Sequence, residues 1–225
     1  MTKTTNHTIQ ISEKIGSVSA LWTSSSNSEY LLVLGHGAGA GMTHTFMEGL
    51  ANALAKEGIA TLRYNFPYME QKKKRPDYPA VAHKTIEEVV NFAANSSKLP
   101  LFVGGKSFGG RMSSQWISKE PKQFVRGLIF YGFPLHSPAK PGAERAEHLF
   151  AIKIPMLFLQ GDRDNLAKLD LLKPVLAKLP LSTLEVFQGG NHSFRFPKKS
   201  GITESEALIG LAKASLEFCR AVTTK

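Results

Sequence analysis

The sequence of 225 residues is poor in cysteine and contains no long apolar run. Cys219 is the sole cysteine, which excludes internal disulfides and cysteine-based metal clusters and fits a reducing compartment. No apolar stretch approaches the roughly 18 residues that a membrane span requires. The first residues also lack the apolar segment of a signal peptide. We therefore expect a soluble, cytoplasmic protein that does not associate with membranes.

Acidic residues are outnumbered, with 18 Asp and Glu against 28 Lys and Arg, which gives a net charge of +10. A basic balance of this kind can attract nucleic acid, anionic lipid or an acidic substrate. The lysines are scattered, however, and only residues 71–75 form a tight run, Gln-Lys-Lys-Lys-Arg. This run lacks the interleaved aromatic residues of a single-strand binder. We interpret it as a solvated face and do not expect nucleic acid as a partner.

The remaining composition, 42% apolar and 20% charged, is ordinary for a globular protein. A chain of this length buries enough surface for a full hydrophobic core. We expect residues 1–225 to form a single domain. The longest irregular piece, Gly132–Phe150, is too short for a separate lid domain.

Short apolar runs alternate with segments of helical periodicity along the chain. The expected strands are Thr8–Ile11, Val18–Trp22, Tyr30–Leu34, Ile59–Tyr64, Pro100–Val103, Val125–Phe130, Pro155–Gln160 and Thr183–Phe187. The expected helices are Ala80–Ala94, Arg111–Lys119 and Glu204–Val222, the last with a capping box between Thr203 and Glu206. This alternation predicts an α/β fold in three layers, with a mostly parallel sheet of about seven or eight strands covered by helices on both faces. The first two strands, which have no helix between them, should pair antiparallel.

Glycine-rich and polar stretches follow six of these strands. They are His36–Gly41, Asn65–Tyr68, Gly105–Gly109, Tyr131–Pro134, Gly161–Asp164 and Gly189–His192. In an open parallel sheet, ligands bind outside the carboxyl ends of the strands. The six stretches therefore predict one site at that edge of the sheet.

The glycines admit three interpretations. Gly-Lys-Ser at 105–107 lacks the earlier glycine of a phosphate-binding loop, because that position is Pro100. The dinucleotide fingerprint fits Gly35-x-Gly37-x-x-Ala40 loosely, but no acidic residue ends the following strand. The third pattern, Gly105-x-Ser107-x-Gly109, matches the nucleophile elbow, a tight strand-to-helix turn that exposes a serine.

A serine nucleophile requires a base that is oriented by a carboxylate. In this type of fold the chain order is serine, acid, histidine. Asp164 and His192 follow Ser107 in that order, each after a predicted strand. We therefore predict that these three residues are catalytic, with Asp162 on the same loop as the alternative acid.

An acyl-transfer site also needs two donors for the oxyanion. We expect them to be the backbone N–H of Phe108, at the start of the helix after Ser107, and that of Ala38 in the glycine-rich loop. His36 is expected to brace this loop rather than to transfer a proton. The sequence shows no spacing of metal ligands, so neither a metal nor a cofactor is expected.

Three aromatic residues on the predicted edge loops, Tyr68, Phe133 and Phe194, either wall the substrate pocket or belong to the core. The charges of Arg75, Arg145 and Lys106 either favour an anionic substrate or are surface charges near an opening.

These motifs resemble the α/β-hydrolase family, especially its small, lidless, dienelactone-hydrolase-like branch, and within it a bacterial group related to the testis-expressed-protein homologues. The resemblance extends from about Leu31 to the last helix and is carried by five segments. They are His36–Met42, Arg63–Tyr68, Gly104–Met112, Glu147–Leu149 and Gly189–Phe194. The family's Gly-x-x-Asp spacing favours Asp164 as the acid, which leaves Asp162 to cap the following turn.

The chain departs from this pattern at two positions. Dienelactone hydrolases carry a cysteine where this chain has Ser107, so their substrate is not transferred to it. Lys106 before the nucleophile is unusual among esterases, and its role is open.

The resemblance and the residues together predict a serine hydrolase that forms an acyl-enzyme from a small ester, lactone or thioester. Without a lid to bury a long lipid chain, short acyl groups are favoured. The alternative is a non-catalytic α/β-hydrolase scaffold that binds a protein or a polyanion through its basic surface.

Overall fold

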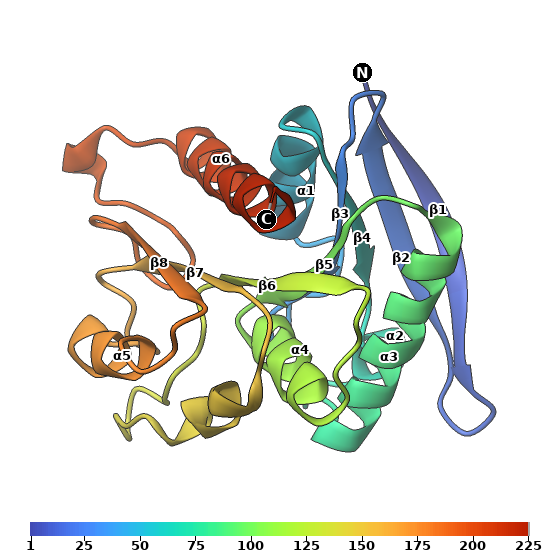
Figure 1. The fold of residues 1–225 in the computed structure, drawn as a ribbon, viewed down its shortest axis with the longest axis horizontal. Coiled ribbons are helices and arrows are strands. Elements are labelled where there is room, and N and C mark those ends of the chain that lie inside the picture. The colour runs from blue at the N-terminus through green and yellow to red at the C-terminus, as the bar shows by residue number, and fades with distance from the viewer. Residues whose placement is uncertain (225) are drawn as a thin grey trace.

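The computed structural model describes residues 1–224 and contains one eight-stranded sheet in the order β1-β2-β4-β3-β5-β6-β7-β8 (Figure 1). Strand β2 pairs antiparallel with both β1 and β4, and all the other neighbours pair parallel. The strands are β1 (Thr2–Ser12), β2 (Gly16–Ser25), β3 (Tyr30–Gly35), β4 (Ile59–Tyr64), β5 (Leu101–Lys106), β6 (Val125–Tyr131), β7 (Met156–Gly161) and β8 (Ser182–Phe187). The predicted three-layer, mostly parallel sheet is confirmed, as is its antiparallel start.

Helices cover both faces of this sheet (Figure 1). The helices are α1 (Thr45–Lys56), α2 (Pro67–Glu70), α3 (Pro79–Ser96), α4 (Phe108–Lys119), α5 (Leu169–Leu176) and α6 (Glu204–Thr223), with 3-10 turns at Glu144–Ala151 and Lys198–Ser200. Helices α1 and α6 lie together on one face, and α3 and α4 lie on the other. No helix within residues 1–224 is long and apolar enough to cross a membrane.

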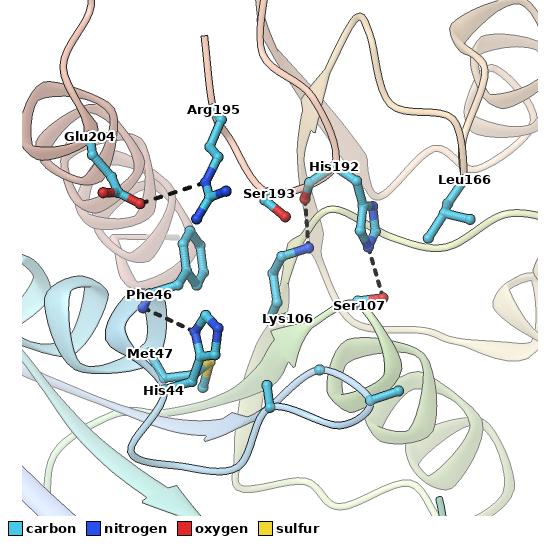
Figure 2. A pocket seen from close by; sticks show the side chains of 13 residues that line it. His44, Phe46, Met47, Lys106, Ser107, Leu166, His192, Ser193, Arg195 and Glu204 are labelled. Atoms are coloured by element: carbon cyan, nitrogen blue, oxygen red, sulfur yellow. Dashed lines mark hydrogen bonds and ion pairs between the residues drawn. The ribbon is translucent and has the colours of Figure 1, made fainter. Parts of the chain in front are cut away.

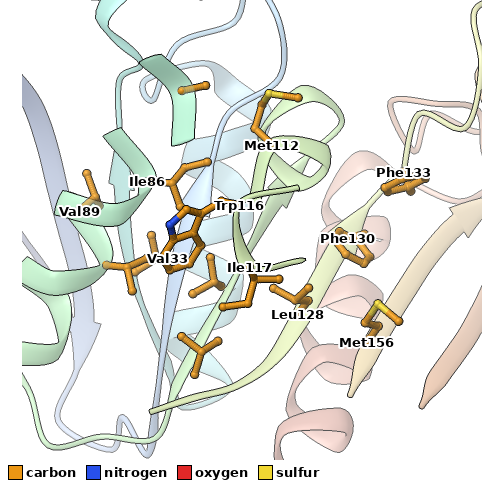
Figure 3. Packing of buried hydrophobic residues seen from close by; sticks show 14 of the residues in the cluster. Val33, Ile86, Val89, Met112, Trp116, Ile117, Leu128, Phe130, Phe133 and Met156 are labelled. Atoms are coloured by element: carbon orange, nitrogen blue, oxygen red, sulfur yellow. The ribbon is translucent and has the colours of Figure 1, made fainter. Parts of the chain in front are cut away.

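The alternation of side chains along the strands divides the core into two parts. On β3, Leu31 and Val33 pack toward α3 and α4, whereas Leu32 and Leu34 pack toward α1 and α6. Figure 3 shows the first part, in which the indole of Trp116 lies among buried aliphatic side chains. Strands buried on both faces explain why the sequence reads there as continuous apolar runs.

The structure differs from the predicted elements at the start of β1 and in three helices, α1, α2 and α5, which were not predicted. Strand β1 begins at Thr2 rather than Thr8, because its polar first half pairs with β2 as an edge strand without contributing much to the core. Helix α1 was not among the predicted helices, although Met47, Leu50 and Leu54 form its buried face. Helix α6 carries the predicted capping box between Thr203 and Glu206.

Candidate active site

Ser107 lies at the tight turn between β5 and α4, with φ 49° and ψ −111°. A positive φ is a strained conformation for a residue with a side chain. The turn is possible because its glycines pack against the backbone of β3. A Cβ on Gly105 would lie 2.3 Å from the Gly35 carbonyl oxygen, and one on Gly109 would lie 2.4 Å from it. The sequence therefore folds into the predicted elbow, with the serine at the carboxyl end of the sheet.

Ser107, His192 and Asp164 form a hydrogen-bonded chain. The Oγ of Ser107 lies 2.9 Å from Nε2 of His192, and Nδ1 of His192 lies 2.7 Å from Oδ2 of Asp164 (the Ser107–His192 contact is drawn in Figure 2). The first residue follows β5, the second follows β8 and the third follows β7. The topology thus brings together three residues that are remote along the chain.

Asp164 is buried, with 3% of its surface exposed, and both of its carboxylate oxygens accept hydrogen bonds. Oδ1 accepts from the backbone N–H of Leu166 at 2.7 Å, and Oδ2 accepts from the side-chain amide of Gln160 as well as from His192. Gln160 in turn accepts from the N–H of Phe133 through its Oε1. These contacts fix the carboxylate that orients the imidazole.

Asp162, the alternative acid, points elsewhere. Its Oδ1 accepts a hydrogen bond from the backbone N–H of Gly189 at 2.6 Å. The expectation that Asp162 caps the following turn is therefore wrong: it ties the loop after β7 to the loop after β8. In doing so it supports the segment that leads to His192.

Burial lowers the pKa of His192 below its ordinary value of 6.5, and the nearby charge of Lys106 lowers it further. The hydrogen bond to Asp164 acts in the opposite direction and raises this pKa, but the net effect is a decrease. The imidazole is therefore neutral near pH 7. A neutral imidazole with its Nδ1–H donated to Asp164 leaves Nε2 free to accept a proton from Ser107.

Two backbone N–H groups beside Ser107 have no hydrogen-bond partner within residues 1–224. Phe108 is the first residue of α4, where an N–H has no acceptor in its own helix. In the loop after β3, the N–H of Gly39 donates to the Tyr68 hydroxyl and that of Ala40 to the Gly37 carbonyl, whereas that of Ala38 is unpaired. Both groups are available to a ligand.

His36 holds the loop after β3 in place. Its Nδ1 donates to the carbonyl of Gly37 at 2.7 Å, and its Nε2 accepts from the N–H of Phe66 at 3.1 Å. Burial lowers the pKa of His36 to about 4, so the ring is neutral. Both nitrogens are thus occupied, as expected for a bracing residue.

A cavity of about 390 Å³ opens beside Ser107 and His192 (Figure 2). Its walls come from the loop after β3, the start of α1, the β5–α4 turn and the segment that follows His192. The side chains that line it include Ala38, His44, Phe46, Met47, Leu166 and Arg195. Its lining mixes apolar side chains with polar and charged ones, and a concave site of this volume can hold a small molecule.

Residues 28–220 match the family model described as "Alpha/beta hydrolase domain". The chain belongs to this family. Among solved structures of α/β hydrolases, it is similar to a dienelactone hydrolase from Anabaena variabilis, with 17% identity over 98% of both chains and a TM-score of 0.76. It is also similar to an α/β serine hydrolase homologue from Coxiella burnetii, with 21% identity over 95% of this chain and 96% of the other and a TM-score of 0.72.

A third similar structure is an α/β serine hydrolase without a lid from Xanthomonas campestris, with 17% identity, 94% of both chains covered and a TM-score of 0.70. At such identities the likeness establishes the α/β-hydrolase fold.

Of the two positions predicted for Tyr68, Phe133 and Phe194, the pocket wall is wrong and the core is correct. Tyr68, Phe133 and Phe194 are at most 1% exposed, and none of them lines the cavity. Tyr68 instead accepts from Gly39 through its hydroxyl, and Phe133 packs in the core. Phe194 stacks behind the ring of Phe46, which lines the wall. Their position next to predicted edge loops did not reveal which side of the backbone each ring takes.

The three basic residues that were predicted near the opening also differ in their position relative to the cavity. Arg75 and Arg145 do not line the cavity, whereas Lys106 does. Lys72–Arg75 lies in the exposed connection between α2 and α3, and Arg75 covers the ring of Tyr78. Sequence reasoning missed Gln160, His44 and Arg195. Of these, only Gln160 gave a signal, as a polar residue at the end of a buried strand.

No group of three or more His, Cys, Asp or Glu side chains suited to a metal ion occurs within residues 1–224.

Proposed function

We propose that the protein is a serine hydrolase that transfers the acyl group of a small ester, lactone or thioester first to Ser107 and then to water. The observation that carries this proposal is the hydrogen-bonded chain from Ser107 through His192 to Asp164, with separations of 2.9 and 2.7 Å. We further propose, from the motifs in His36–Met42 and Gly104–Met112, that within the α/β-hydrolase family the chain is related to the bacterial group of the testis-expressed-protein homologues.

In the first half of the reaction, the Oγ of Ser107 attacks the substrate carbonyl carbon while its proton passes to Nε2 of His192. The tetrahedral intermediate then collapses: the bond from carbon to the leaving oxygen or sulfur breaks, and the leaving group takes the proton from His192. In the second half, water gives a proton to His192 and attacks the acyl carbon. The Ser107 oxygen leaves with that proton, and the acid is released.

Asp164 orients the imidazole and offsets the positive charge that it gains. Because Asp164 is buried and its oxygens accept three hydrogen bonds, it holds one tautomer of His192. The N–H groups of Phe108 and Ala38 would bind the oxyanion, and each such donor contributes about 2.7–4 kcal/mol of transition-state stabilisation. The reaction requires no cofactor.

The cavity of about 390 Å³ favours a substrate with a short acyl group. Its volume lies at the small end of the range of roughly 300–1,000 Å³ that is usual for sites of drug-sized ligands. Phe46, Met47 and Leu166 supply apolar contacts for such a group.

A fluorophosphonate probe tests the proposal, because it bonds through phosphorus to an activated serine oxygen as fluoride leaves. We expect labelling at Ser107 that is lost in Ser107→Ala and kept in Ser193→Ala, a serine on the same cavity. A panel of acyl esters and thioesters of graded length would then define the substrate. If the folded protein resists the probe and instead binds polyanions with a steep salt dependence, the non-catalytic scaffold is the better description.

A further inference from the structure

Lys106, the residue before Ser107, is buried at the back of the cavity and has only 8% of its surface exposed. Its side chain runs beneath the segment that carries His192 (Figure 2). There its Nζ donates a hydrogen bond of 2.6 Å to the backbone carbonyl of His192. The proposed mechanism has no use for this lysine.

Two adjacent residues, Lys106 and Ser107, therefore form hydrogen bonds with the main chain and with the side chain of His192. Ser107 contacts the imidazole at 2.9 Å, and Lys106 contacts the main-chain carbonyl of the same residue at 2.6 Å. Both come from the end of β5, which lies inside the sheet between β3 and β6. The position of the base is thus tied to the strand that positions the nucleophile.

The surroundings of Lys106 are shaped for this contact. Gly132, with φ +72°, lies beneath it, and a Cβ there would lie 3.1 Å from Nζ and 3.2 Å from the His192 carbonyl oxygen. The rings of Phe46 and Phe194 lie 6.0 and 5.9 Å from Nζ, within the range of cation–π attraction. The absence of a side chain at Gly132 thus leaves space in which the ammonium and the His192 carbonyl meet.

The segment after His192 needs such an anchor. Phe194 has a positive φ of 56°, which is strained for an aromatic residue. Backbone in a sparsely populated region persists only where its surroundings hold it. The bond from Lys106 secures this segment two residues before the strained position.

Stability does not account for a lysine here. No carboxylate lies within 4 Å of Nζ among residues 1–224. The charged group that acts on it is Asp164, whose oxygens already accept from His192, Gln160 and Leu166. Burial lowers the pKa of Lys106 to about 7. Because a buried cation without a paired anion opposes folding, the residue is expected to serve the reaction.

We propose that Lys106 is a positioning residue: by holding the carbonyl of His192, it keeps the imidazole within reach of the Ser107 hydroxyl through acylation and deacylation. This inference rests on the proposed serine hydrolase function. Lys106 acts through His192 and makes no contact with the reacting atoms.

The test compares Lys106→Met, which keeps most of the length of the side chain but removes the donor, with Lys199→Met. Lys199 is an exposed lysine on the connection from His192 to α6. Labelling by the fluorophosphonate is followed in time at several probe concentrations, which separates the maximal rate from the affinity for the probe. We expect Lys106→Met to lower the maximal rate about 10- to 100-fold with unchanged affinity, because a small misplacement of a catalytic group has effects of this size. Lys199→Met should behave like the unmodified protein.

The pH profile of the labelling rate gives a second readout. Asp164 and Lys106 are the charged groups that act on His192 within the part of the chain that is described. Removal of the Lys106 charge should raise the pKa of His192, so that the acid limb of the profile moves to higher pH in Lys106→Met. An acid limb that stays in place would contradict the coupling between the two residues.

Thermal unfolding gives the third readout. In the folded protein the pKa of Lys106 lies below that of an exposed lysine, so its charge opposes folding most strongly below pH 7 and progressively less as the pH rises above it. Lys106→Met should therefore keep or raise the unfolding midpoint, with a larger gain at pH 6 than at pH 9, while the labelling rate falls. If the midpoint and the labelling rate fall together, Lys106 is merely structural and the inference is wrong.

A second variant, Lys106→Ala, leaves room for propylamine in place of the missing side chain. We expect added propylamine to restore part of the labelling rate in this variant and to leave the unmodified protein unaffected. An absence of rescue would count against the inference. A change in affinity confined to anionic probes in Lys106→Met would make Lys106 a substrate anchor and would also overturn it.

The failure of the inference is distinguishable from that of the proposed function. If the unmodified protein is not labelled at Ser107, the proposed function itself fails. If it is labelled and Lys106→Met is labelled at the same rate, only the role of Lys106 is wrong.

Discussion

At the scale of single residues, the site depends on which of two neighbouring carboxylates reaches His192. Asp164 and Asp162 are both acidic, lie on one loop and are separated by one residue. The loop directs Asp164 inward, where it is 3% exposed, and Asp162 toward the N–H of Gly189. Burial and the direction of hydrogen bonding, rather than residue type, separate their roles.

The two acids provide a matched pair of variants. We expect Asp164→Asn to lower kcat for ester hydrolysis roughly 10³- to 10⁴-fold, because an amide at this position no longer favours the tautomer of His192 that accepts the Ser107 proton. Asp162→Asn keeps an oxygen for the Gly189 N–H and should retain near-full activity. Steady-state hydrolysis of p-nitrophenyl butyrate measures both. Equal losses in the two variants would refute the assignment of Asp164.

The dependence on pH follows from the environment of His192. Only the neutral imidazole accepts the proton of Ser107, and burial together with Lys106 lowers the pKa of His192 below 6.5. We therefore expect kcat/KM to rise with pH and to reach half its plateau below pH 6.5. A profile of kcat/KM from pH 4.5 to 8 tests this expectation. A midpoint above 6.5, or no dependence at all, would contradict it.

At the scale of secondary-structure elements, the elbow depends on the close approach of α4 to β3. Gly109 in α4 donates its N–H to the His36 carbonyl, and its Cα faces the backbone of Gly35. A side chain there would collide with main-chain atoms that cannot move without displacing β3. The glycines around Ser107 are thus a packing requirement between elements.

Alanine substitutions at two helical glycines, Gly109 and Gly49, separate the effect of close packing from that of helix propensity. Gly109→Ala places a Cβ 2.4 Å from the Gly35 backbone, and we expect a loss of unfolding free energy of about 1–3 kcal/mol. Gly49→Ala in α1 meets only the movable end of the Leu208 side chain, so the gain in helix propensity of about 1 kcal/mol should largely offset the contact. Urea-induced unfolding measures both variants. Similar losses for both would contradict the packing argument.

The positions of strands and helices could be predicted where a buried face requires apolar residues at regular or consecutive positions. Strands β3 to β8 were found from their apolar runs, and helices α3, α4 and α6 from their apolar periodicity. The first half of β1 could not be found in this way, because an exposed edge strand of threonine and lysine carries no apolar alternation. Helix α1 carries a pattern that was present but not predicted, in Met47, Leu50 and Leu54.

At the scale of the whole molecule, the site arises because the carboxyl ends of the parallel strands meet at one edge of the sheet. This rule predicted that Ser107, Asp164 and His192 would come together, and the structure places them in one hydrogen-bonded chain. It did not predict which side chains line the cavity. The direction of Tyr68, Phe133 and Phe194 depends on the backbone conformation of each loop. The contact of Lys106 with the His192 carbonyl depends on the space left by Gly132, 26 residues further along the chain.

The formation of an acyl-enzyme on Ser107 is the central claim, and acid quenching during the hydrolysis of p-nitrophenyl butyrate tests it directly. Mass spectrometry of the digested protein should find a butyryl group on the peptide that contains Ser107, and no such group in Ser107→Ala. A protein that hydrolyses the ester with the butyryl group on another residue, or with equal rates before and after Ser107→Ala, would contradict the account.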